Sequence, residues 1–124
     1  MPFLDIITTI IDEDQEDNIR ELGNPNEREF YEYMLSYAPY ENIEPREYPN
    51  ILITAGFNDT HVYYWPAAKF AAKLRAMKKD HNRLLFKTNM KGGHGGAMFS
   101  GRLESFRESA YEYAFLLDLA GIRE

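Results

Sequence analysis

Two polar residues in the second half of the chain each follow a short apolar run. Asp59 comes soon after residues 51–55 (ILITA), and His94 lies in the glycine-rich segment 92–96 (GGHGG), which follows apolar residues 84–86. If both runs are neighbouring parallel strands, both side chains reach the carboxyl edge of one sheet, where open α/β sheets place their active sites. An imidazole that a carboxylate orients can move protons to and from a hydroxyl nucleophile. The spacing therefore predicts that Asp59 and His94 form an acid–base pair.

Both residues also have plainer interpretations. An Asp after a strand is often a turn former or a helix cap, and a His between glycines can mark a tight turn or an anion-binding nest. The glycine-rich segment lacks the Lys-Ser/Thr ending of a P-loop, so a phosphate cradle is not expected. The three histidines, His61, His81 and His94, match no standard zinc spacing, and an HExxH motif is absent. The sequence therefore predicts no metal site and no cofactor.

The nucleophile that such a pair would serve has no candidate in this sequence. A G-x-S-x-G elbow is absent, and every serine lies in another context. In α/β-hydrolases the chain order is Ser, acid, His, so a segment that starts between the Ser and the acid would look like this one. We therefore expect residues 1–124 to be the C-terminal segment of a catalytic domain, and to be inactive without the rest of the enzyme.

The elements that must position Asp59 and His94 follow a strand–helix–strand–helix order. Residues 50–55 and 83–88 are predicted strands, whose uninterrupted apolar character indicates parallel strands covered on both faces. Residues 64–79 and 102–120 are predicted helices, as are residues 27–37. The last helix is expected to bury an apolar stripe made of Leu103, Phe106, Ala110, Tyr113, Ala114 and Leu117. The order predicts an α/β fold, and two strands are too few to complete its sheet.

The N-terminal part is harder to interpret. Residues 3–11 are apolar and β-branched, which suggests extended chain, but the run is too short to distinguish a strand from a buried helix. Acidic residues crowd into positions 12–17, so residues 12–18 are predicted to be a solvated loop. The alternative for this cluster is a surface that attracts a cationic ligand.

Composition excludes several classes of function. Apolar residues make up 44% of the chain and the net charge is −6, so the chain can fold around a core but has no basic stripe for nucleic acid. The apolar runs are too short to span a membrane. Cysteine is absent, which excludes disulfides and suits a reducing compartment.

Several blocks of sequence stand in one order along the chain. The clearest are YPNILITAGFND (48–59), VYYWPAAK (62–69), GHGG (93–96) and SGR (100–102). Further blocks are PFLD (2–5), GNP (23–25), YEYM (31–34) and SYAPY (36–40). Together these blocks resemble the prolyl oligopeptidase family of serine peptidases, most strongly its oligopeptidase B, or protease II, branch, and the resemblance covers nearly the whole chain. The expected fold is the C-terminal portion of an α/β-hydrolase fold.

The resemblance implies a role for each member of the predicted pair. Asp59 would be the acid and His94 the base of a Ser-His-Asp triad, with the serine and a β-propeller in a part of the enzyme not present here. The family cleaves short peptides, needs no metal and is usually cytoplasmic, although a periplasmic location stays open. It also favours a short helix, not a strand, near residues 5–11.

The sequence departs from the family pattern in three places. The first is the stretch before GNP, where oligopeptidase B has acidic residues that bind an Arg or Lys side chain of the substrate. Here this stretch contains Arg20, which would repel that side chain, and Glu21, which could bind it. His61 stands where relatives use an Arg to hold a substrate carbonyl, so it is either a substrate contact or a plain surface histidine. Residues 97–99 lengthen the segment after GHGG and would alter the rim of the pocket.

Two other functions stay open. The chain could be a structural or assembly module, whose uncovered strands and apolar faces would make the isolated segment self-associate. It could also belong to another α/β-hydrolase, such as an esterase.

Overall fold

A two-stranded parallel sheet forms the centre of the fold. The computed structural model describes residues 3–13, 16–94 and 101–122. Strand β1 (Ile51–Gly56) pairs with β2 (Leu84–Asn89), in a register that sets Ile51 beside Leu84 and Gly56 beside Asn89. Because the strands are parallel, both carboxyl ends lie at one edge of the sheet. The sequence predicted both strands and their direction correctly.

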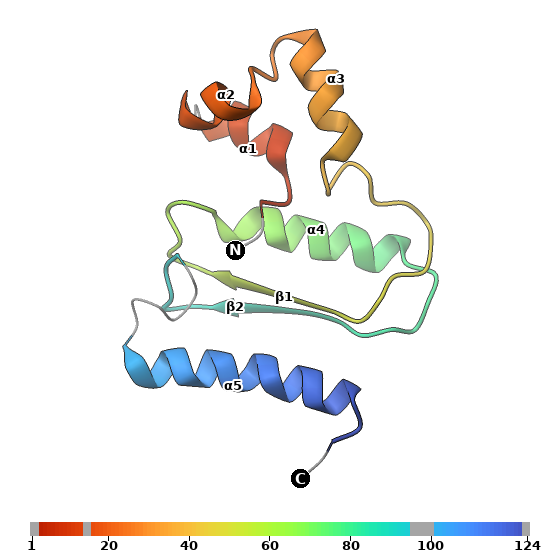
Figure 1. The fold of residues 1–124 in the computed structure, drawn as a ribbon, viewed down its shortest axis with the longest axis vertical. Helices are drawn as coiled ribbons and strands as arrows, with labels where there is room; N and C mark the ends of the chain where they lie inside the picture. The colour runs from red at the N-terminus through yellow and green to blue at the C-terminus, as the bar shows by residue number, and fades with distance from the viewer. Residues whose placement is uncertain (1–2, 14–15, 95–100, 123–124) are drawn as a thin grey trace.

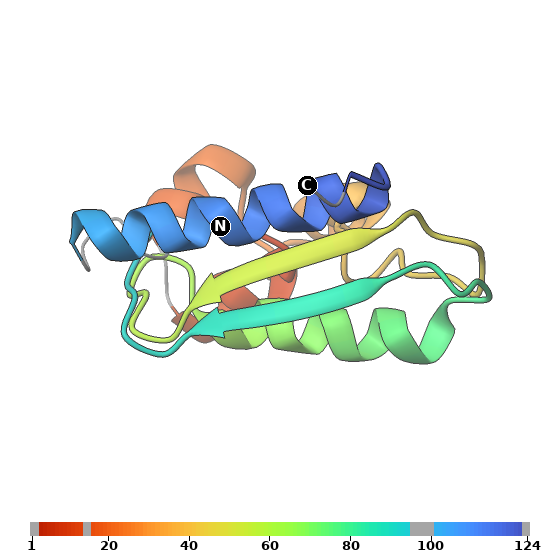
Figure 2. The same ribbon diagram turned by 90° about the horizontal axis from the view of Figure 1, so that it is seen from below.

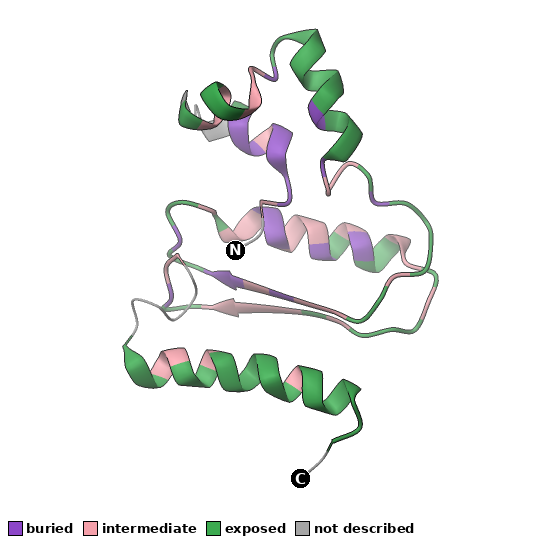
Figure 3. Cartoon of the chain, in the orientation of Figure 1, coloured by how far each residue is buried: buried purple, intermediate pink, exposed green. Residues whose placement is uncertain are grey.

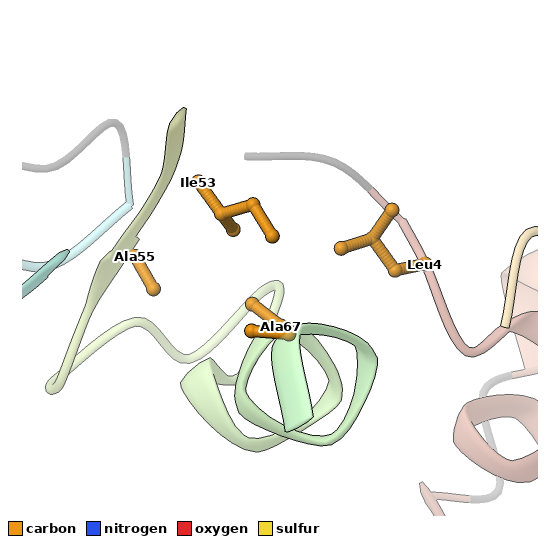
Figure 4. Close-up of a cluster of buried hydrophobic side chains, with 5 residues drawn as sticks. Leu4, Ile53, Ala55 and Ala67 are labelled. Carbon is orange, nitrogen blue, oxygen red and sulfur yellow. The ribbon is translucent and has the colours of Figure 1, made fainter. Parts of the chain in front are cut away.

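Two helices lie on opposite faces of this sheet, α4 (Tyr64–Met77) and α5 (Arg102–Leu119) (Figures 1 and 2). Helix α4 buries Ala67, Ala71 and Leu74, whose three- and four-residue spacing gives one apolar face. Figure 4 shows how Ala67 meets Ile53 and Ala55 of β1 and Leu4 from the N-terminal segment. The small alanines let the helix approach the strand closely. Both helices were predicted, and α4 ends two residues earlier than expected.

The remaining helices form a helical lobe, made of α1 (Ile6–Glu13), α2 (Glu16–Leu22) and α3 (Arg28–Tyr37). Figure 1 shows it on the far side of α4 from the sheet. Its core contains Ile6, Ile7, Ile10, Met34 and Ala38, all buried. The predicted helix over residues 27–37 is confirmed.

Two suggestions of the N-terminal sequence, extended chain near residues 3–11 (with a buried helix left open) and a loop over residues 12–18, differ from the structure. Residues 6–11 are helical and not extended, because burial of Ile6, Ile7 and Ile10 on one face outweighs the weak helix propensity of β-branched residues. The short helix that the family resemblance favours is therefore confirmed. The expected loop over residues 12–18 is also wrong where the structure describes it, since residues 12–13 end α1 and residues 16–18 begin α2.

A half-buried ion pair connects α4 to Asp5, the residue just before the helical lobe. The carboxylate of Asp5, with no exposed side-chain surface, accepts a hydrogen bond from Nζ of Lys69 on α4. Burial of the Lys69 ammonium opposes its charge, but the hydrogen bond to Asp5 and the charges of Asp5, Tyr40 and Glu41 together outweigh this and raise the pKa of Lys69 above its ordinary value. Lys73, one turn further along α4, donates to the carbonyl of Tyr40 at 2.8 Å. Charged contacts thus connect the lobe to the sheet layer.

The expectation that α5 buries an apolar stripe was wrong for this chain. Helix α5 has no buried residue in Figure 3, and Leu103 and Tyr113 are 75% and 66% exposed. The helix meets the sheet through polar contacts, among them the ion pairs Lys87–Glu108 and Arg83–Asp118. Most of its apolar side chains therefore stay exposed.

Candidate active site

Asp59 lies in the turn that follows β1 and is buried. Its Oδ1 accepts the backbone N–H groups of His61 and Val62, each at 2.9 Å, so the side chain closes its own turn. Burial penalises the carboxylate charge, but these N–H groups and His94 outweigh it and hold the pKa of Asp59 below its ordinary value. Asp59 is therefore an ionised acceptor at neutral pH, and also the turn former of the plainer interpretation.

His94 follows β2 at the same edge of the sheet. Its Nδ1 lies 3.1 Å from both carboxylate oxygens of Asp59, although 35 residues separate the two in sequence. A carboxylate can only accept, so Nδ1 carries the proton and the lone pair of the neutral ring is on Nε2. The side chain of His94 is 43% exposed, whereas that of Asp59 is fully buried. A buried carboxylate thus orients an accessible imidazole.

Close contact between the two loops brings the pair together. The N–H of Phe57 donates to the carbonyl of Asn89 at 2.9 Å, and the N–H of Asn58 donates to the carbonyl of Gly92 at 3.0 Å. Gly56 allows this approach, because a Cβ there would lie only 2.4 Å from the carbonyl oxygen of Gly93. The sequence marked Gly56 only as the end of a strand; this contact becomes visible only in three dimensions.

Of the other sequence-predicted residues, the structure brings only His61 close to the pair. The ring of His61 lies beside that of His94, with 5.1 Å between centroids and 67° between planes. His81 precedes β2 and lies at the opposite end of the strands. Glu21 is exposed on α2, and within the described residues no hydrogen bond or ion pair joins it to Asp59 or His94. The predicted longer segment at residues 97–99 lies outside the described residues.

No grouping of three His, Asp or Glu residues that could hold a metal ion occurs within residues 3–13, 16–94 and 101–122. In the same part of the chain, no helix is both long enough and apolar enough to cross a membrane. The chemistry that the described site supports is proton transfer through His94.

The structural neighbours of this chain have the α/β-hydrolase fold, and its parallel strands between helices, with an oriented imidazole at their carboxyl edge, fit that class. A sequence model of the prolyl oligopeptidase family matches residues 1–123. The chain belongs to the prolyl oligopeptidase family.

Individual relatives agree with this assignment. The chain is 45% identical over 125 residues to Protease 2 of Moraxella lacunata, covering 98% of this chain and 18% of that protein. It is 39% identical over 125 residues to dipeptidyl aminopeptidase BI of Pseudoxanthomonas mexicana, covering 98% and 17%. The closed form of oligopeptidase B from Trypanosoma brucei with covalently bound antipain superimposes with a TM-score of 0.88 at 40% identity, covering 99% of this chain and 18% of that one. The chain thus spans less than a fifth of the length of these relatives.

Proposed function

We propose that this chain is the C-terminal part of the catalytic domain of a serine oligopeptidase, with Asp59 and His94 as the acid and base of a Ser-His-Asp triad. The contact between the buried Asp59 carboxylate and Nδ1 of the accessible His94 carries the proposal. It leaves the lone pair of Nε2 for the nucleophile. The serine and its oxyanion hole come from a part of the enzyme outside residues 1–124.

In the proposed reaction, His94 carries each proton in turn. Nε2 takes the serine hydroxyl proton while the oxygen attacks the peptide carbonyl carbon, and gives it to the leaving amine as the C–N bond breaks. Water then attacks the acyl-enzyme and loses a proton to Nε2, which returns it to the serine oxygen. Asp59 stays ionised throughout, consistent with its lowered pKa, and stabilises the imidazolium.

Short peptides are the proposed substrates. The names of the relatives include a protease and an aminopeptidase, and the Trypanosoma brucei enzyme holds antipain covalently. His61 is the proposed substrate contact, because its exposed ring lies beside His94 at the edge of the sheet. Glu21 is proposed to attract a cationic substrate side chain, against the repulsion of neighbouring Arg20. An E21Q variant of the complete enzyme tests this: it should raise KM for peptides with Arg before the cut more than for peptides with Leu there.

Replacement of the base tests the proposed triad. In the complete enzyme, H94A should lower kcat for a short peptide amide by roughly 10⁴-fold or more, as loss of a triad member does elsewhere. The matched control is H81A, which removes an exposed imidazole at the opposite end of the strands and should leave kcat unchanged. Near-normal turnover in H94A would remove this residue from the mechanism. Parallel assays on matched ester and amide substrates separate a peptidase from an esterase.

The isolated chain is proposed to be inactive and to self-associate. Its exposed apolar residues include Leu103, Phe106 and Leu116 on α5, which are 75%, 59% and 58% exposed. Burial of such a surface against a second copy would release water and stabilise the contact. Sedimentation should therefore show oligomers. A compact monomer at high concentration, or hydrolysis of reporter peptides by the isolated chain, would contradict this proposal.

A further inference from the structure

Asn89, the last residue of β2, organises the first part of the loop that carries His94. Its side-chain Oδ1 accepts the backbone N–H groups of Lys91 at 3.0 Å and Gly92 at 2.8 Å. The N–H of Gly92 also approaches the carbonyl oxygen of Asn89 at 3.3 Å. One side chain thus folds the backbone of residues 89–92 into a tight turn two residues before the imidazole.

The other end of the Asn89 amide is held by α5. Its Nδ2 donates to Oε1 of Glu108 at 3.1 Å, while Oε2 of Glu108 pairs with the ammonium of Lys87 on the same strand. The Lys87 ammonium also lies 4.7 Å from the ring centroid of Tyr111. The Glu108 side chain is only 19% exposed, so water screens these contacts weakly. Helix α5, which buries no apolar residue, therefore has a defined polar attachment beside the loop.

The turn organised by Asn89 is also the surface that meets the Asp59 loop. The carbonyl of Gly92 accepts the N–H of Asn58, and the amide of Asn58 reaches the carbonyl of Met90 at 3.4 Å. Any rotation of the peptide groups at residues 91–92 would therefore move His94 relative to Asp59. Catalytic geometry is sensitive to such displacements, since a shift of about 1 Å can cost about 100-fold in rate.

We propose that Asn89 and Glu108 are positioning residues that hold the His94 loop in register with Asp59, and that α5 serves as the rigid support of this network. The proposal rests on the proposed function of His94. It requires an amide at position 89: the oxygen must face two N–H donors, and the opposite group must donate to a carboxylate. A carboxylate at position 89 would keep the first interaction and turn the second into repulsion.

This asymmetry allows a rescue experiment in the complete enzyme. N89D should lower kcat for a short peptide amide about 10- to 100-fold, with KM within about twofold of the wild type. N89D combined with E108Q restores a donor opposite an acceptor, and should recover kcat to within about threefold of the wild type. E108Q alone keeps an oxygen that accepts from Asn89 but loses the ion pair with Lys87, whose 28% exposed side chain can turn to water. It should therefore change kcat by less than about threefold.

The matched control is D118N, which removes the Arg83 ion pair at the far end of α5 and should leave kcat unchanged. If thermal unfolding shows that N89D does not fold, the E108A variant tests the network instead. A lower kcat with unchanged KM in E108A supports the network, and an unchanged kcat overturns it. A folded N89D with wild-type kcat, or a defect that E108Q does not relieve, also overturns it. In either case the loss of activity in H94A would still hold, so failure of this network is distinct from failure of the proposed triad.

Discussion

Gly56→Ala is the change most directly connected to the contact between the two loops. A Cβ on residue 56 would lie 2.4 Å from the carbonyl oxygen of Gly93 and 2.8 Å from that of Gly92, so one loop must move by about 0.6 Å to reach even 3.0 Å. Both obstacles are backbone atoms, which cannot rotate away as a side chain can. Along the line between the loops, this shift would stretch the 3.1 Å distances between Nδ1 of His94 and the Asp59 oxygens to about 3.7 Å, beyond hydrogen-bond range.

The expected loss in kcat of the complete enzyme is therefore about 10- to 100-fold. Overpacking should also destabilise the fold by about 1–3 kcal/mol. This exceeds the stabilisation of about 0.4–1 kcal/mol that replacing Gly by Ala gives by making the unfolded chain less flexible. The assay compares kcat and the thermal unfolding midpoint with those of G93A, a control whose Cβ would lie at an ordinary 3.6 Å from the carbonyl of Asn58. Wild-type kcat and stability in G56A would refute the reasoning.

Two further predictions concern stability. Hydrogen bonding by Lys78, together with backbone N–H groups, lowers the pKa of Asp80 from 3.8 to about 2. Asp80 therefore stabilises the fold above its unfolded pKa, and this contribution disappears as the pH falls through about 2. The thermal midpoint of D80N should lie below that of the wild type at pH 6, and the gap should shrink below about pH 4; a gap that persists at pH 2 would contradict this. K69M leaves the Asp5 charge buried without its partner. It should therefore lower the unfolding free energy by about 3 kcal/mol in denaturant titrations, which is the low end for a broken buried pair because Lys69 is 38% exposed. R28A, which breaks an exposed pair, should cost less than about 1 kcal/mol, and equal effects would show that burial of Asp5 is unimportant.

Sequence patterns over a few neighbouring residues were enough to predict the strands and the buried face of α4. The apolar run ending at Gly56 identified β1, and the spacing of Ala67, Ala71 and Leu74 identified the buried face of α4. Parallel direction followed from the intervening helix, and it in turn placed Asp59 and His94 at one edge. Topology converts two positions that are remote in sequence into neighbours, so this juxtaposition could be predicted without coordinates.

Where burial depends on partners, the sequence was a poorer guide. Residues 6–11 have β-branched side chains that suit a strand, yet they form a helix because Met34 and Ala38 supply an apolar surface for one face. The opposite error occurred on α5, where an apolar stripe is a necessary condition for burial but not a sufficient one. Helical periodicity in the sequence shows that a helix has an apolar face, but that face is buried only if another part of the protein packs against it.

The sequence by itself determined the family, the order of strands and helices, and which two residues could form an acid–base pair at the edge of the sheet. Only the tertiary structure decided that Nδ1 of His94 meets both oxygens of Asp59, that Gly56 leaves room for this, and that the Asn89 amide bonds to both Gly92 and Glu108. The physical reason is the distance along the chain over which each interaction is set. Strand and helix patterns follow from steric and hydrophobic preferences of neighbouring residues, but a hydrogen bond tolerates only a few tenths of an ångström, which packing between distant segments must set.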